Sequence, residues 1–201
     1  MKTYIKTILL LLAVLMTCSC ASAPEVLLPP DQGFEKNAIH LMLRSDPKLN
    51  FYEDLPHPLL VCVYQLRDPN SFNQLADDTD GLYELLQCSL FDPTVLNSKR
   101  LTVHPGQDLD ISLDRAEGAK YVGLVAGYYS IKKDRISRLF DIPVEVVEEA
   151  SDKHRKYQRI AHINVEVILG PQQIHSSHSD IAKQEGKDQI NKGKKKGEGK
   201  D

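Results

Sequence analysis

The chain has 201 residues, of which 41% are hydrophobic and 26% are charged. This composition is typical of one globular domain with a short appendage. Lys and Arg total 25 against 28 Asp and Glu, which gives a net charge of -3. No nucleic acid is expected as a partner, because domains that bind polyanions are strongly basic.

The first twenty residues have the pattern of an export signal. Lys2 and Lys6 precede an uncharged apolar run over residues 8–16. This run has the length of a signal-peptide core and is too short to cross a bilayer.

Two cysteines at the end of this run compete for lipidation. The letters M-T-C-S-C stand there and resemble a bacterial lipobox. Cys20 follows a small serine, whereas Cys18 follows a branched threonine, so we predict that Cys20 is lipidated and that residues 1–19 are the signal peptide. The alternative is ordinary cleavage near Ala21 or Ala23, which discards both cysteines. The lipobox resemblance also implies a sorting rule, under which Ala21 rather than Asp after the lipidated cysteine indicates the outer membrane.

A tether and a strand-rich domain follow. Residues 20–36 contain prolines and little periodicity, so they are predicted to link the lipidated N-terminus to the domain. From residue 37 apolar and polar side chains alternate, which predicts a half-buried strand around residues 39–43. Residues 59–66 are apolar on both faces and predict a central strand. The domain is predicted to span residues 37–170.

The middle of the chain contains two further alternating runs. Residues 101–103 lead through a turn at residues 104–107 into residues 109–113, where apolar residues alternate with aspartates and a serine. This pattern predicts a hairpin with one face in water.

The last predicted strands lie between residues 120 and 170. Residues 120–130 are apolar on both faces and predict a core strand, in which Gly123 and Gly127 allow close approach of another group. Residues 140–146 alternate, and a proline among them indicates an edge or a bulge. Residues 161–169 alternate again and predict the last strand.

A helical segment separates the second and third predicted strands. Ser71 and Gln74 fit a capping box, and apolar residues follow at helical spacing up to Leu86, with Gly81 splitting the segment into two short helices. Seven strands with this single insertion predict a mainly β, two-sheet sandwich rather than a parallel α/β fold. Residues 171–201 lose the apolar pattern and are predicted to be a disordered, lysine-rich tail.

Chemistry-bearing motifs are absent. The sequence contains no G-x-S-x-G, P-loop or G-x-G-x-x-G pattern. The acidic residues 77–81 resemble part of a calcium loop, but Ala76 and Gln87 stand where acidic ligands belong. No catalytic residue, metal or cofactor is therefore predicted. Cys62 and Cys88 either pair as a disulfide after export or remain two buried thiols.

Three segments carry a family resemblance. Residues 60–68 leading to Phe72, residues 101–106 and residues 114–129 occur in this order around the helical insertion. Together with the lipobox they resemble the type VI secretion outer-membrane lipoprotein family TssJ, also called SciN or VasD. The resemblance implies a transthyretin-like β-sandwich anchored in the outer membrane and facing the periplasm. It also implies an assembly component without catalysis, which binds the periplasmic C-terminal region of the inner-membrane protein TssM and joins other type VI membrane-complex subunits.

The resemblance places the partner contact in the loop between the first two strands, residues 45–57. Apolar and aromatic side chains in a loop that prolines restrict suit a preorganised contact. The alternative is that Phe51 and Tyr52 fold down onto the sandwich. A rival function is a lipoprotein that carries a small ligand in an apolar cavity of the sandwich. The predicted contact residues are Leu49, Asn50, Phe51, Tyr52, Glu53, Asp54, Leu55 and Pro56.

Overall fold

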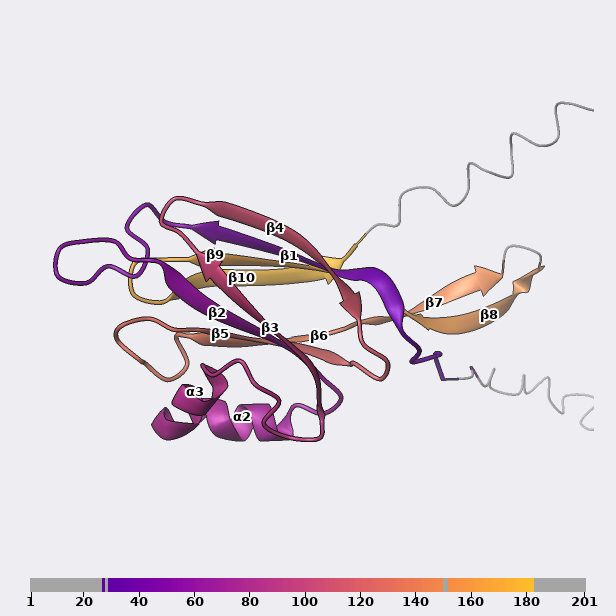
Figure 1. Ribbon diagram of the computed structural model, residues 1–201. Helices are drawn as coiled ribbons and strands as arrows, with labels where there is room; N and C mark the ends of the chain where they lie inside the picture. The colour runs from indigo at the N-terminus through magenta and orange to yellow at the C-terminus, as the bar shows by residue number, and fades with distance from the viewer. Residues whose placement is uncertain (1–26, 28, 150–151, 183–201) are drawn as a thin grey trace, which may run out of the picture.

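Two four-stranded sheets face each other in the computed structural model, which describes residue 27, residues 29–149 and residues 152–182 (Figure 1). One sheet has the order β10-β9-β1-β4 and the other β3-β2-β5-β6, while β7 and β8 form a separate two-stranded sheet. The predicted two-sheet sandwich with a helical insertion is confirmed. The elements are β1 (Glu35–Ser45), β2 (Leu59–Leu66), α2 (Asn70–Ala76), α3 (Thr79–Leu85), β3 (Val95–Val103), β4 (Asp108–Arg115), β5 (Tyr121–Ala126), β6 (Ser137–Asp141), β7 (Val144–Glu149), β8 (Asp152–Ile160), β9 (Ile163–Leu169) and β10 (Ile174–Ile181).

Strand β1 lies inside the first sheet because one of its faces is apolar. Ile39, Leu41 and Leu43 are fully buried and alternate with more exposed residues. β1 pairs antiparallel with β4 and parallel with β9, so that Ile39 lies opposite both Leu113 and Ile163. The first strand of the domain is therefore held by a strand from its C-terminal part.

The second sheet is built around β2, which pairs with β3 on one side and with β5 on the other. All of β2 except Leu60 is buried, in agreement with its continuous apolar run. Gly123 on β5 leaves room for the ring of Phe72 from α2, since an added Cβ would lie 2.8 Å from a ring carbon. The helical insertion thus packs on this sheet at Gly123, one of the two glycines at which close approach of another group was predicted.

The predicted hairpin over residues 101–113 is wrong. β3 and β4 alternate as expected, but they belong to different sheets, and residues 104–107 connect the two layers. Alternation reports only that one face of each strand is buried, and a short turn between sheets produces the same pattern as a turn within one sheet.

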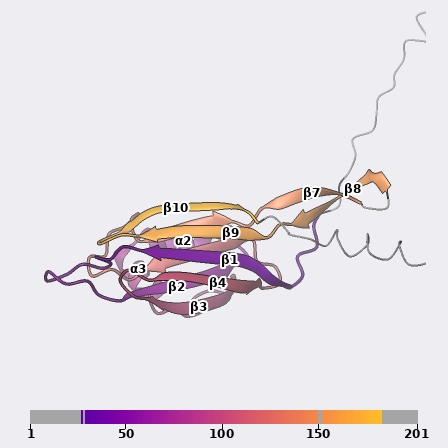
Figure 2. The ribbon, with the colours of Figure 1, turned by 90° about the horizontal axis from the view of Figure 1, so that it is seen from above.

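The predicted strand over residues 140–146 is two strands. β6 ends at Asp141 and β7 begins at Val144, because the proline between them cannot donate a ladder hydrogen bond. β7 pairs with β8, which was not predicted, and the β7–β8 hairpin projects from one end of the sandwich (Figures 1 and 2).

The predicted tail begins too early at residue 171. β10 pairs antiparallel with β9 at the edge of the first sheet, from Ile174 opposite Leu169 to Ile181 opposite Ile163. Its polar residues are compatible with a strand because an edge position leaves most of its side chains facing water. Residues 183–201 lie outside the described part of the chain.

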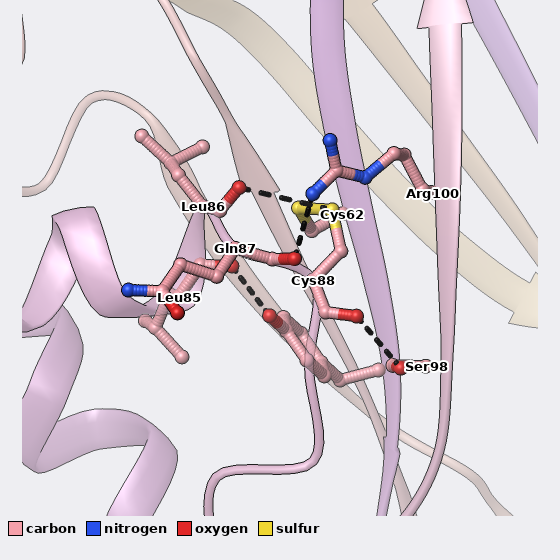
Figure 3. Close-up of a disulfide and its surroundings, with 8 residues drawn as sticks. Cys62, Leu85, Leu86, Gln87, Cys88, Ser98 and Arg100 are labelled. Carbon is pink, nitrogen blue, oxygen red and sulfur yellow. Dashed lines mark hydrogen bonds between the residues drawn. A yellow bond between two sulfur atoms is a disulfide. The ribbon is translucent and has the colours of Figure 1, made fainter.

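The helical insertion is fixed to the second sheet by a disulfide between Cys62 on β2 and Cys88 after α3 (Figure 3). Ser98 Oγ and an Arg100 guanidinium nitrogen, both on β3, donate hydrogen bonds to the carbonyls of Cys88 and Gln87, at 2.9 and 2.7 Å. The chain after the helices is therefore attached to both of these strands.

The break between the two helices does not fall at Gly81. It falls at residues 77–78, where the Asp78 carboxylate accepts a hydrogen bond from the Gly81 amide and caps α3. Gly81 lies within α3 and faces the α2 backbone, since an added Cβ would lie 2.3 Å from the Leu75 carbonyl oxygen. The predicted capping box at Ser71 is also absent, because α2 has no side-chain cap.

Candidate functional site

The β1–β2 loop comprises residues 46–58, and its tip, residues 52–55, is a small hydrogen-bonded turn. Tyr52 and Leu55 exchange two backbone hydrogen bonds of 3.0 Å. Both residues between them, Glu53 and Asp54, have positive φ angles of 49° and 59°. Two-residue turns of this kind match the twist of the strands they join. The loop therefore ends in an ordered turn with two exposed carboxylates.

Backbone hydrogen bonds attach the base of this loop to the sandwich. The Asp46 amide donates to the Leu169 carbonyl at 2.9 Å, and the Phe51 amide donates to the Pro171 carbonyl at 2.7 Å. The Gly106 amide from the β3–β4 turn donates to the Asp46 carbonyl at 3.2 Å. Two separate segments, the β9–β10 connection and the β3–β4 turn, thus hold the base of the loop.

Two of the predicted contact residues lie beneath the loop instead of on its surface. Leu49 is fully buried, and Asn50 is buried with a positive φ of 48°. The Asn50 side-chain amide donates to the Pro58 carbonyl at 3.2 Å, and its oxygen accepts from the Tyr129 amide at 3.0 Å. Asn50 therefore joins both ends of the loop to the β5–β6 connection.

Aromatic side chains form the outer surface of this region. Tyr52 stacks on Tyr129, with ring centroids 4.2 Å apart and an angle of 9° between planes, and His57 meets Tyr129 edge-on at 5.2 Å. Tyr52 is 44% exposed and Tyr129 is 58% exposed. Phe51 is half-buried, and the Lys48 ammonium group lies over its ring, 5.8 Å from the ring centre. Tyr52 thus rests on another aromatic ring and still presents much of its surface to solvent.

A cleft of about 310 Å³ lies among these aromatic residues. Tyr128 is buried beside it, and burial raises the pKa of its hydroxyl well above the ordinary value, so this group stays neutral at physiological pH. The cleft therefore offers an uncharged aromatic floor. Its lining residues are Asn50, Phe51, Tyr52, Tyr128, Tyr129, Ser130, Pro171 and Gln172.

Sequence reasoning missed Tyr128, Tyr129 and Pro171. The two tyrosines end the run that predicted the core strand, and Pro171 appeared only as the start of the tail. No local pattern connects them with Tyr52, since they meet only when the β5–β6 and β9–β10 connections reach the same end of the sandwich.

A second cleft, of about 580 Å³, lies between β1, β2, β3 and β4. Most of its lining side chains are polar, which does not suit an apolar ligand. This cleft gives no support to the carrier function. Its residues are Asn37, Val63, Gln65, Asn97, Ser98, Lys99, Ser112, Leu113 and Asp114.

No group of three or more His, Cys, Asp or Glu residues in the described part of the chain is arranged to hold a metal ion. No helix there has the length and apolarity that a membrane crossing needs. The predicted signal peptide and the two candidate lipidation sites, Cys18 and Cys20, lie outside the described residues.

Comparison with known families decides the identity of the domain. The sequence model described as type VI secretion lipoprotein, VasD, EvfM, TssJ, matches residues 37–172. The chain belongs to this type VI secretion lipoprotein family. No curated protein sequence matches it.

Solved structures show the same fold at low sequence identity. The T6SS lipoprotein TssJ1 from Pseudomonas aeruginosa is 19% identical, with a TM-score of 0.55, over 77% of this chain and 100% of that one. A chain of the structure described as the T6SS protein TssM C-terminal domain from EAEC is 15% identical, with a TM-score of 0.51, over 70% and 96%. Serratia marcescens Lip, a membrane bound component of the type VI secretion system, is 17% identical, with a TM-score of 0.50, over 68% and 94%.

The general role of the protein follows from its family. It is an outer-membrane lipoprotein component of the type VI secretion membrane complex and has a structural rather than an enzymatic function. In this type VI secretion lipoprotein, the β1–β2 loop and Tyr129 form an exposed surface with a hydrogen-bonded backbone and stacked aromatic rings.

Proposed function

We propose that the protein links two membranes. Lipidated Cys20 anchors it in the outer membrane, and the β1–β2 loop together with Tyr129 binds the periplasmic C-terminal region of a TssM-like inner-membrane protein. The contact residues at the surface are Phe51, Tyr52, Leu55 and Tyr129.

The stacked pair of Tyr52 and Tyr129 carries this proposal. Interfaces take much of their binding energy from a few aromatic side chains, and tyrosine is among the residues favoured there. A loop that is already ordered loses little conformational entropy when a partner binds. Both conditions are met here, because the rings are exposed while the backbone beneath them is hydrogen-bonded.

The position of the loop also suits a link between membranes. The N-terminal segment enters the domain next to the β7–β8 hairpin, at the opposite end from the β1–β2 loop (Figures 1 and 2). An anchor at one end leaves the loop at the other end directed away from the lipid. A chain with this fold is also present in a structure of the TssM C-terminal domain.

The binding experiment is a calorimetric titration of the protein with the periplasmic C-terminal region of its cognate TssM-like protein. Replacing Phe51 and Tyr52 together with Ala removes aromatic contact area and is expected to weaken binding by about tenfold or more. The matched control is Tyr83→Ala, because Tyr83 on α3 is also an exposed tyrosine but lies on the helical insertion. Tyr83→Ala is expected to bind like the wild type.

Two results contradict the proposal. If the wild-type protein is folded and does not bind the TssM region, the partner assignment is wrong. If both variants bind with unchanged affinity, the contact lies elsewhere on the domain. Circular dichroism of each variant separates loss of binding from loss of folding.

The anchor is tested separately by membrane fractionation. Cys20→Ser is expected to release the protein from the outer membrane, while the control Cys18→Ser leaves it attached. The opposite result moves the lipid to Cys18. If both single variants and the double variant, with Cys18→Ser and Cys20→Ser combined, all stay in the membrane fraction, an anchor linked to either cysteine is refuted.

A further inference from the structure

The β7–β8 hairpin forms a separate two-stranded sheet and exposes apolar side chains. Val144 and Val146 are 50% and 53% exposed, and Tyr157 is also exposed. Val144 and Val146 are two residues apart on one strand, so they lie on the same face of the hairpin. Two-stranded ribbons are marginally stable unless another surface covers one face.

The hairpin is located where the chain leaves for its anchor. The N-terminal segment passes the root of the hairpin (Figure 1). Pro30 and Gln32 on this segment line a cleft of about 200 Å³ together with Val144 and Ile160. The Gly118 amide donates a hydrogen bond of 2.7 Å to the Gln32 carbonyl and fixes this part of the segment to the domain. The part of residues 20–36 that precedes the domain is therefore shorter than predicted.

The remaining length limits how far the hairpin can be from the lipid. Pro29 is nine residues after Cys20, which corresponds to about 30 Å of fully extended chain. Strand β8 has nine residues and is itself about 30 Å long. The root of the hairpin, beside Pro30, therefore lies within about 30 Å of the lipidated residue, a distance that the hairpin itself can span.

We propose that the Val144 and Val146 face of the β7–β8 hairpin rests on the lipid surface that holds the anchor. This inference rests on the lipid anchor of the proposed function. Among the described strands β7 and β8 pair only with each other, so both outer edges of the hairpin lack a strand partner, and the hairpin must remain at the boundary between headgroups and acyl chains. Glu148 and Lys156 lie opposite each other on this same face, two residues further toward the tip than Val146, so the charged part of the face lies among the headgroups.

A single tryptophan tests the contact, since the chain contains none. Val146→Trp is prepared in the full-length lipidated protein and reconstituted in vesicles of phosphatidylethanolamine and phosphatidylglycerol. Its tryptophan emission in vesicles is expected to be shifted to the blue. The reference is the non-lipidated form of the same variant in buffer without detergent. Lipids brominated near the headgroup end of the acyl chain are expected to quench it more strongly than lipids brominated at the chain terminus.

The matched control is Tyr83→Trp, because Tyr83 is 57% exposed on α3 and lies away from the hairpin. Its emission and quenching are expected to be the same with and without vesicles. Adding Val144→Asp to the Val146→Trp protein is expected to reduce the quenching, since a carboxylate on this face opposes contact with acyl chains.

Flotation of the same vesicles separates the two proposals. If the protein floats and Trp at position 146 is neither shifted nor quenched, the hairpin contact is refuted while the anchor stands. If the protein does not float, the anchor fails and the hairpin inference falls with it. If the shift appears without vesicles when the TssM region is added, the surface is covered by protein instead of lipid, and this also overturns the inference.

Discussion

The two segments that project from opposite ends of the sandwich are held in different ways. The β1–β2 loop is hydrogen-bonded to the β9–β10 connection, to the β3–β4 turn and, through Asn50, to the β5–β6 connection. The β7–β8 hairpin is held by its own strand pairing and by an ion pair between Glu145 and Arg159 at 2.8 Å. One projection is therefore part of the sandwich framework, whereas the other is largely self-contained.

This difference separates two kinds of binding surface. A loop fixed by buried hydrogen bonds can present a particular shape to one protein at a small entropic cost. A self-contained ribbon can adjust its angle to a surface that has no fixed shape, such as a lipid bilayer. The exposed carboxylates at the tip of the loop, Glu53 and Asp54, favour a surface that carries basic groups.

The largest expected effect comes from breaking the fixed loop at Asn50. Asn50→Leu leaves the Tyr129 amide and the Pro58 carbonyl without partners and places a branched side chain at positive φ. We expect the free energy of unfolding to fall by about 2–4 kcal/mol, measured by urea denaturation. Asn50→Gly relieves the positive φ and isolates the cost of the lost hydrogen bonds. A stability equal to that of the wild type for Asn50→Leu would falsify the framework role of this residue.

The next effect concerns binding without a change in stability. Tyr129→Ala removes the ring beneath Tyr52 but leaves the backbone hydrogen bond to Asn50 in place. We expect the affinity for the TssM region to fall by about 1–2 kcal/mol, measured by calorimetry, with an unchanged thermal transition. A variant that loses stability and keeps its affinity contradicts the assignment of Tyr129 to the contact.

Shortening the hairpin is expected to have a smaller effect on stability. Replacing residues 147–157 with Asn-Gly joins Val146 to Gln158, which already lie opposite each other, through a favourable two-residue turn. Because the removed residues pair with one another, the free energy of unfolding is expected to change by about 0.5 kcal/mol or less. A loss of several kcal/mol in chemical denaturation would show that the hairpin belongs to the cooperative core.

The smallest expected effect is a pH dependence at the end of the sandwich where β1 begins. Burial raises the pKa of Glu35. The hydrogen bond with His162 at 2.8 Å and the charges of His162 and Arg115 together lower it by more, so the pKa lies below its ordinary value of 4.5. A carboxyl with a lowered pKa stabilises the fold above its ordinary pKa, and this contribution disappears as the pH falls through the lowered value. Because Glu35 is partly exposed, the contribution is about 0.5 kcal/mol or less. Glu35→Gln should remove this part of the stability change in acid denaturation, and an unchanged pH profile would contradict it.

Periodicity predicted those strands that have one apolar face or two. It identified β1, β2, β5 and β9 because their buried residues repeat at a spacing of two or form a continuous run. It missed β8 and β10 because their sequences are mostly charged or polar. Strand pairing stabilises these two without the apolar stripe that a sequence pattern detects.

The candidate site could be predicted only in part for a related reason. The family resemblance and the aromatic content of residues 45–57 indicated Phe51 and Tyr52. The same reasoning placed Leu49 and Asn50 at the surface, whereas both are buried and support the loop. Tyr129 contributes through its stack on Tyr52, a contact between residues 77 positions apart that only the tertiary structure creates.

The parallel pairing of β1 with β9 sets the order in which this protein can mature. Ile39 lies opposite Ile163, so the strand that emerges first from the ribosome needs a neighbour that is synthesised more than one hundred residues later. Contacts so distant along the chain form slowly. The first sheet therefore stays incomplete until nearly the whole polypeptide has crossed the inner membrane. Because this sheet forms late, the chain stays unfolded during export. Folding is then completed in the compartment where Cys62 and Cys88 can be oxidised.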